Sequence, residues 1–170
     1  MWRRNIIIGV LILLFVGILT AHGAISGVFG FSRGSLVATG DLWGLGADAD
    51  VTVVGTAQVT ALCQSPGGHV APGRSPISYT AQAWADLVVD ENGHASFTLS
   101  VADPSLGDVP VSPNPKEAGC PSDSWSVVGV EVRWVAAQVI VNKFTGSGGL
   151  NETAVWNFSC SDDGATLTCQ

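Results

Sequence analysis

Charge is scarce in this chain, and positive charge is the scarcer sign. Only 12% of the 170 residues are charged, with 7 Lys and Arg against 14 Asp and Glu, which gives a net charge of -7. So few charges exclude a solvated disordered chain and a long surface helix or coiled coil. The shortage of cations also argues against nucleic acid as a partner, which needs clustered basic side chains, and against electrostatic docking on anionic membranes.

Histidine is equally rare, and the sequence contains no assembled catalytic set. The three histidines are His22, His69 and His94, and His69 lies in a loop rich in Pro and Gly where it could meet Asp48 or Asp50. A small secreted hydrolase that uses His69 with a loop carboxylate is therefore one alternative. A literal G-x-S-x-G at residues 30–34 lacks the strand-to-helix context of a hydrolase elbow, and we interpret it as a flexible leader.

The first 23 residues have the pattern of a cleaved secretory signal peptide. Arg3 and Arg4 precede an apolar run over 6–20, and the small residues Ala21 and Gly23 suit the cleavage site. The alternative is an uncleaved anchor, although the run is shorter than the roughly 20 residues that span a bilayer. Cleavage predicts a secreted, extracellular protein that meets the membrane only transiently. It leaves five basic residues against all 14 acidic ones.

Four cysteines in an exported chain predict disulfides rather than a metal site, because neither C-x-x-C nor a nearby His pair is present. Four cysteines allow three pairings. A turn signal at 162–164 lies between Cys160 and Cys169, and a hairpin there would bring both ends together. Cys160–Cys169 is therefore favoured, and Cys63–Cys120 follows by elimination. We expect no cofactor and no metal.

Apolar and polar residues alternate along most of the remaining chain, which predicts β-strands. In residues 51–63, valine, alanine and Cys63 recur at every second position, as in a half-buried strand. No stretch has a convincing helical period with caps. The further strands are expected at 36–42, 78–89, 95–101, 125–144, 153–159 and 165–169.

Turn and loop signals separate these strands. Asn92 and Gly93 predict a hairpin turn at 90–93, because Asn-Gly tolerates the positive φ of such turns. Four prolines make 103–119 a loop, since proline cannot donate to a β-ladder. After Trp134 the apolar pattern slips by one residue, which indicates a β-bulge or two strands joined by a sharp bend.

These patterns predict an all-β fold, an antiparallel immunoglobulin-like β-sandwich of about seven to nine strands with two disulfides. The expected divisions are a signal peptide at 1–23, a leader and first strand at 24–40, and one sandwich domain at 41–170.

Both halves of the expected Cys63–Cys120 pair lie in recognisable motifs. Cys63 opens the run Cys-Gln-Ser-Pro-Gly-Gly-His-Val-Ala-Pro-Gly-Arg-Ser-Pro, and Cys120 opens Cys-Pro-Ser-Asp-Ser-Trp before a valine-rich strand. Together they resemble a family of small secreted proteins of bacteria and filamentous fungi with C-x-x-PGG-x-x-APG-x-x-P and CP-x-x-x-W motifs. The resemblance covers roughly residues 42–141, with Ser65 and His69 departing from the family pattern. It implies secretion, β structure and the Cys63–Cys120 bridge, and it carries over no activity or catalytic residue.

Tryptophan is the most informative residue type, because a flat indole on a sheet can stack on sugar rings or on a partner protein. Trp134 continues an apolar face and is predicted to lie in the core, and Trp125 is predicted to pack on the nearby disulfide. Trp43 and Trp84 have a less clear phase. A core position is favoured for both, and a binding role is the alternative.

Two further features concern the surface. Asn151 and Asn157 begin N-glycosylation sequons, and strand alternation predicts that Asn157 is exposed. The acidic pairs Asp48/Asp50 and Asp162/Asp163 lack the spacing of an EF-hand calcium loop.

The sequence predicts a secreted, non-catalytic binding or envelope-matrix protein whose natural ligand is a polysaccharide or another extracellular protein. Trp43, Trp84 and His69 are its candidate binding residues. The alternatives are the His69 hydrolase and a structural subunit that self-assembles through an exposed edge strand.

Overall fold

The computed structural model describes residues 24–170, in which all regular secondary structure is β-strand. The expected signal peptide at 1–23 lies outside the described residues. The strands are β1 (Ser26–Ser32), β2 (Leu36–Trp43), β3 (Asp48–Gln64), β4 (Val70–Pro72), β5 (Ile77–Asp86), β6 (Ala95–Val101), β7 (Ser126–Phe144), β8 (Leu150–Asp162) and β9 (Leu167–Cys169).

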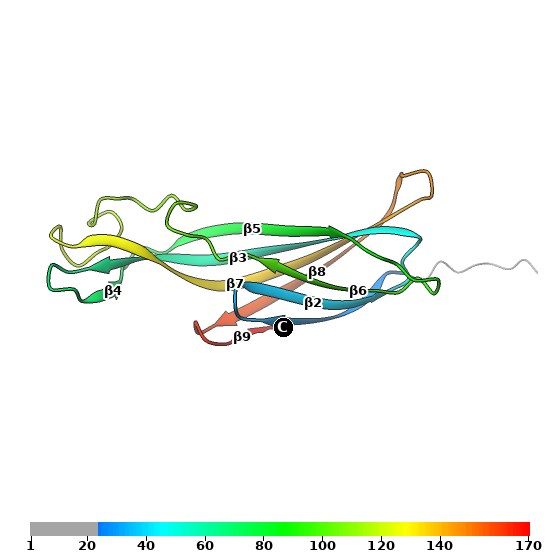
Figure 1. Ribbon diagram of the computed structural model, residues 1–170, viewed down its shortest axis with the longest axis horizontal. Helices are drawn as coiled ribbons and strands as arrows, with labels where there is room; N and C mark the ends of the chain where they lie inside the picture. The colour runs from blue at the N-terminus through cyan, green and yellow to red at the C-terminus, as the bar shows by residue number, and fades with distance from the viewer. Residues whose placement is uncertain (1–23) are drawn as a thin grey trace, which may run out of the picture.

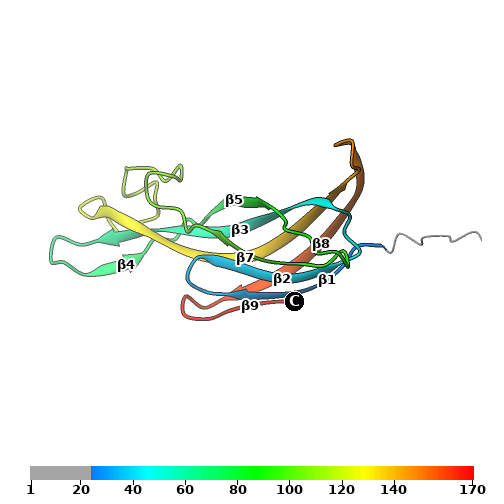
Figure 2. The ribbon, with the colours of Figure 1, turned by 45° about the vertical axis from the view of Figure 1, so that its right-hand side comes forward.

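These strands form two antiparallel sheets. The small sheet has the order β1–β2–β6. The large sheet has the order β4–β3–β7–β8–β9, and β5 pairs with the first part of β3. In the elongated molecule, β3 and β7 run most of the length, with β4 at one end and the β7–β8 turn at the other (Figures 1 and 2). The all-β, antiparallel class predicted from the sequence is confirmed.

A hydrophobic core lies between the two sheets. Leu36 and Leu42 of β2 are fully buried, as are Val53 of β3 and Val139 of β7. Trp134 is also fully buried and belongs to the same cluster. Because inward residues alternate with outward ones along each strand, the same strands also form a second, solvent-facing surface on each sheet.

Strand β7 remains one continuous strand across the predicted phase slip. Thr56 pairs with Ala136 and Ala57 pairs with Trp134, so Val135 is the extra residue of a β-bulge. A second register shift, between Leu62 and Cys63, leaves Val128 unpaired and exposed. The apolar face that the sequence predicts for Trp134 therefore does not extend to Val128, because this bulge reverses the alternation.

The structure contains the two disulfides favoured by the sequence, Cys63–Cys120 and Cys160–Cys169. Cys160 and Cys169 are directly opposite in the β8–β9 hairpin, with their Cα atoms 4.1 Å apart. Cys63–Cys120 closes a separation of 57 residues and attaches the proline-rich loop to the end of β3. Trp125 packs against the small cluster around this bridge, as predicted.

Two local expectations need correction. The flexible leader expected at residues 30–34 is instead the end of β1 and its turn into β2, because β1 pairs with β2 along its whole length. The turn at 90–93 forms, with the backbone N–H of Gly93 donating to Asp90, but it does not join a hairpin. The strand before it, β5, pairs with β3, whereas the strand after it, β6, pairs with β2 in the other sheet.

No helix long and apolar enough to cross a membrane occurs in the part of the chain that the structure describes.

Candidate functional site

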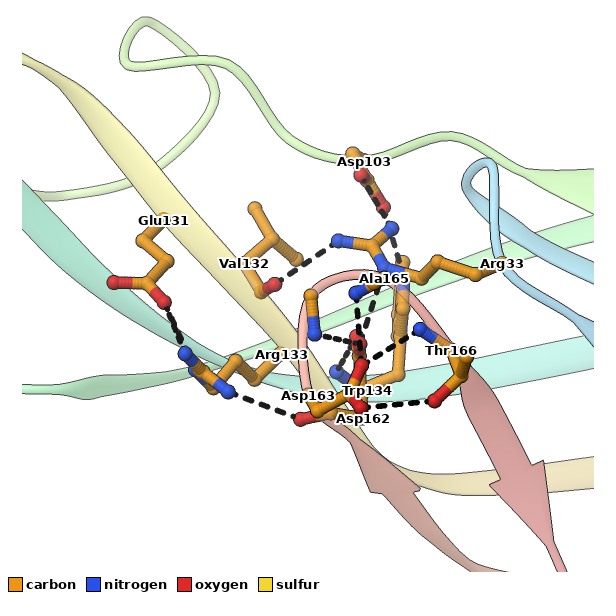
Figure 3. A network of polar contacts seen from close by, with 11 residues as sticks. Arg33, Asp103, Glu131, Val132, Arg133, Trp134, Asp162, Asp163, Ala165 and Thr166 are labelled. Atoms are coloured by element: carbon orange, nitrogen blue, oxygen red, sulfur yellow. Dashed lines mark hydrogen bonds and ion pairs between the residues drawn. The ribbon is translucent and has the colours of Figure 1, made fainter.

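A cluster of charged side chains joins four segments that are distant from one another in the sequence (Figure 3). Arg33, in the β1–β2 turn, donates to Asp103 at 2.8 Å, to Asp162 at 3.1 Å and to the Val132 carbonyl at 3.1 Å. Asp103 also accepts from the Trp134 indole N–H at 2.8 Å, and Asp162 accepts from the Trp134 backbone N–H at 3.0 Å. The cluster therefore fixes the β7 bulge against β1, β6 and β8.

The electrostatics of this cluster are those of a satisfied ion pair. The Asp162 side chain is fully buried, and the Arg33 side chain is only 16% exposed. Burial alone would lower the pKa of Arg33, but the hydrogen bonds and charges of Asp103 and Asp162 outweigh it and raise that pKa. Among residues 24–170, no buried side-chain nitrogen or oxygen atom lacks a hydrogen-bond partner. We therefore assign the cluster a structural role.

The outward side of the large sheet carries a different set of residues, which we call the Trp84 face. Trp84 is 65% exposed, and the residues opposite it across the strands are Thr52, Ile140 and Val155. The neighbouring rows are polar. They consist of Gln82, Val54, Gln138 and Asn157 on one side, and of Asp86, Asp50, Asn142 and Thr153 on the other.

Polar side chains on the Trp84 face hold one another in position. The Gln138 side-chain amide donates to Asn157 Oδ1 at 2.7 Å. The Asn142 amide donates to Asp50 Oδ1 at 2.9 Å, and Asn142 Oδ1 accepts from the Thr153 hydroxyl at 2.8 Å. These bonds fix amide and carboxylate groups beside an exposed indole, so little side-chain entropy remains to be lost when they meet a ligand.

The Trp84 face is hollowed on the side toward Gln138 and Asn157. The residues that line this hollow are Val54, Thr56, Ala136, Ala137, Gln138, Asn157 and Phe158. Ala136, which is opposite Thr56, leaves room between the longer side chains of this face, whereas Ala137 is buried in the core. The face thus combines a flat apolar platform, a shallow hollow and fixed polar groups, which is the chemistry that recognises a sugar ring.

The structure places both ambiguous tryptophans at the surface. Trp43 is 43% exposed and Trp84 is 65% exposed, so the favoured prediction that they lie in the core is wrong for both. Trp134 is fully buried, as predicted. The physical reason is the strand phase: Leu42 takes the inward position next to Trp43, and the inward neighbours of Trp84 on β5 are alanines.

His69 does not meet the carboxylates suggested for it. It is exposed in the turn after β3, where its backbone N–H donates to the Ser65 hydroxyl at 3.0 Å. Asp48 and Asp50 lie at the opposite end of β3, and some 14 strand residues at about 3.3 Å each separate Asp50 from Gln64 by about 45 Å. The predicted pairing of His69 with these acids is wrong, because the extended strand keeps them apart.

The acidic pair Asp162/Asp163 is already hydrogen-bonded within the protein. Asp162 holds Arg33, and Asp163 accepts from the backbone N–H groups of Thr166 at 2.7 Å and Ala165 at 2.9 Å. These contacts, from Thr166 first, lower the pKa of Asp163. Within residues 24–170, no group of three or more His, Cys, Asp or Glu is placed to hold a metal ion.

Both predicted sequons lie at the surface. Asn151 is exposed at the start of β8, and Asn157 is exposed on the Trp84 face between the inward-facing Trp156 and Phe158. The exposure predicted for Asn157 is confirmed. A glycan on Asn157 would cover the hollow, so use of this sequon and use of the Trp84 face exclude each other.

The sequence analysis missed the charged cluster and the polar rows. Arg33 is 70 residues from Asp103 and 129 from Asp162 along the chain, so no local sequence motif predicts their contact. The rows of the Trp84 face depend on strand register, which alternation alone does not supply. The available signal was the repeated Ala in Thr80–Asp86, which alternates with larger and more polar side chains.

No family model, curated protein or solved structure matches the chain. The resemblance of its two cysteine motifs to a family of small secreted proteins therefore stays a prediction.

Proposed function

We propose that this chain is a non-catalytic extracellular protein with an immunoglobulin-like β-sandwich fold, and that its Trp84 face binds an uncharged polysaccharide. Two antiparallel sheets around one core support the sandwich. Two disulfides support an oxidising compartment, because such bonds persist outside the cytosol.

The observation that carries the binding proposal is the exposure of Trp84 beside fixed polar groups. An indole that is 65% exposed on a sheet contributes nothing to the core, yet it presents a large flat apolar surface to the solvent. The Gln138–Asn157 pair and Asp50 can exchange hydrogen bonds with sugar hydroxyls, while the apolar face of a sugar ring stacks on the indole. Four adjacent strands at about 4.8 Å spacing give the face a width of about 14 Å, room for a few linked sugars.

The charges of the face support an uncharged ligand. The rows that contain Gln82, Trp84 and Asp86 include no Lys or Arg, and their charged members are Asp50 and Asp86. An anionic polymer would be repelled by these carboxylates, and the net charge of -7 adds to that repulsion. Uronic-acid polymers, sulfated glycans and nucleic acids are therefore disfavoured.

Co-sedimentation of the oxidised mature protein tests this proposal. The panel is microcrystalline cellulose, chitin, insoluble β-1,3-glucan and starch, with calcium pectate as the anionic polymer and cell envelopes of the source as the complex one. We expect pelleting with at least one uncharged polymer and a loss of about tenfold or more in affinity for Trp84→Ala, as for a central aromatic anchor.

Thr80→Ala is the matched control, because Thr80 is exposed on the same face of β5. It should bind like the unmodified protein. Pelleting that Trp84→Ala leaves unchanged would contradict the proposed face. Pelleting with cell envelopes alone, if lost in Trp84→Ala, would keep the face and replace the polysaccharide with another extracellular ligand.

A further inference from the structure

The outward side of the small sheet carries a second exposed tryptophan, Trp43 of β2. We call this side of the small sheet the Trp43 face. Trp43 is 43% exposed at the end of β2. Its ring lies 5.3 Å from the ring of His94 at an interplanar angle of 38°. The contact with His94 fixes the indole in one orientation while leaving much of its surface open.

Small polar side chains surround a hollow next to Trp43. Val28 on β1, which is 65% exposed, is opposite Asp41 on β2, and Asp41 is opposite Ser96 on β6. The Ser96 hydroxyl donates to Asp41 Oδ1 at 2.6 Å. The hollow is lined on this side by Val28, Gly30, Thr39, Asp41, Ser96 and Thr98.

The hollow depends on Gly30, which is opposite Thr39. A Cβ atom added at Gly30 would lie 3.0 Å from the Thr39 hydroxyl oxygen, so a side chain at this position would crowd Thr39. No Lys or Arg side chain is among the residues of this face, and its carboxylate is Asp41. The Trp43 face therefore repeats the chemistry of the Trp84 face: an exposed indole, a hollow, a hydrogen-bonded carboxylate and hydroxyl groups.

The two faces point away from each other. Trp43 follows Leu42, which is fully buried in the core, and Trp84 follows Ala83, which packs against the same core from the other sheet. Each indole thus lies on the solvent side of its own sheet, and two packed sheets have an inter-sheet distance of about 10 Å. A short stretch of polymer on one face does not reach the other across the core.

We propose that the Trp43 face is a second site for the same class of uncharged polysaccharide, so that one molecule bridges two polymer chains. This inference rests on the proposed function, because bridging needs the Trp84 face as well. Two sites on opposite sides of one rigid domain convert a binding protein into a cross-linker, which gains avidity on a dense polymer matrix.

A capture assay tests bridging directly. The protein is bound to whichever insoluble polymer of the panel pellets it, the unbound protein is washed away, and a fluorescent soluble fragment of the same polymer is added. The unmodified protein should retain the fragment. Trp84→Ala should still pellet through the Trp43 face, but with about tenfold lower affinity, and Trp43→Ala should still pellet through the Trp84 face. Capture should fall about tenfold or more in each single variant, and the double variant should no longer pellet.

Ser100→Ala is the matched control for the small sheet, since Ser100 is exposed on the outward side of β6. It should capture like the unmodified protein. Sedimentation velocity at the assay concentration should give a monomer, because a dimer would bridge with one face per molecule and would overturn the inference.

The outcomes separate the two proposals. Capture that is undiminished in Trp43→Ala, together with pelleting that depends on Trp84, would overturn the second site and leave the proposed function intact. Pelleting that is insensitive to Trp84 would contradict the proposed function itself. Thermal unfolding curves that overlay those of the unmodified protein show that the Trp43→Ala chain is folded, so that a loss of capture reports the lost indole.

Discussion

The two sides of the large sheet come from the same strands and have opposite characters. On the inner side, Val53 and Val139 are fully buried against the small sheet. On the outer side, Trp84 and Val155 are 65% and 48% exposed in the row between polar neighbours. The comparison shows that burial, and not residue type, separates the apolar residues of this sheet: those on the inner side hold the fold, and those on the outer side remain in contact with solvent.

Trp134 and Trp84 show the same contrast between a buried and an exposed position within one residue type. Trp134 is enclosed and its indole N–H donates to Asp103, so both its apolar and its polar parts are satisfied by the protein. The Trp84 side chain, in contrast, is largely exposed to solvent. The difference predicts that one tryptophan determines stability and the other determines binding.

The largest expected effect is on the inner side. Trp134→Ala would leave a large cavity and remove the indole donor to Asp103, and we expect a loss of about 3–5 kcal/mol in the free energy of unfolding. Trp84→Ala should change it by less than about 0.5 kcal/mol. Urea unfolding of both variants measures these free energies. Equal losses of unfolding free energy in the two variants would contradict the distinction between the stabilising inner side and the exposed outer side.

The next effect on stability concerns the charged cluster around Arg33, which fixes the β7 bulge. Arg33→Ala leaves the fully buried Asp162 carboxylate without its partner, and we expect a cost of about 3–5 kcal/mol. Arg133→Ala is the control, because the Arg133 side chain is 46% exposed in its pair with Glu131 and should contribute about 1 kcal/mol or less. Similar urea midpoints for the two variants would contradict the structural role assigned to the charged cluster.

A glycan on the outer side should weaken binding without unfolding the protein. When the chain is produced in a host that N-glycosylates, occupancy of Asn157 should cover the hollow and reduce binding about tenfold or more. Ser159→Ala removes that sequon and keeps Asn157 itself, so it should restore binding. Mass spectrometry reports the occupancy, and full binding by a protein glycosylated at Asn157 would contradict the assigned face.

The smallest effect is expected at the exposed β8–β9 turn. The pKa of Asp163 is lowered by the backbone N–H groups of Thr166 and Ala165, so the ionised carboxylate stabilises the folded state above its unfolded pKa. This stability is lost as the pH falls through the lower folded pKa. Asp163→Asn should therefore lower the urea midpoint slightly near neutral pH, and this difference should shrink as the pH falls through the lowered folded pKa. A difference that persists in acid would point to the turn geometry instead.

Local patterns predicted the elements of this fold well. Strand β6 spans the expected Ala95–Val101, and the phase slip after Trp134 corresponds to the bulge at Val135. The alternation along β3 gives its buried residues directly, because strongly apolar valines occupy the inward positions. Both disulfide pairs also follow from spacing and elimination.

Features that depend on pairing between distant strands could not be predicted. The turn at Asn92-Gly93 is local, but its two flanking strands belong to different sheets, since the partners are chosen by the whole fold. The phase of Trp84 was unclear from the sequence, because the small alanines that take the inward positions on β5 give only a weak signal. Arg33 and its acidic partners meet only after four segments have assembled.

The most direct test of the central claim is a two-dimensional ¹H–¹⁵N spectrum of the protein during titration with cellohexaose, chitohexaose and laminarihexaose. Binding on the Trp84 face predicts that at least one of these oligosaccharides shifts the indole N–H resonance of Trp84 together with the side-chain amides of Gln82, Gln138 and Asn157. The indole resonance of buried Trp134 should not move. Saturable shifts that leave Trp84 unchanged, or no shifts with any of the three, would contradict the assignment of the outer face as the binding surface.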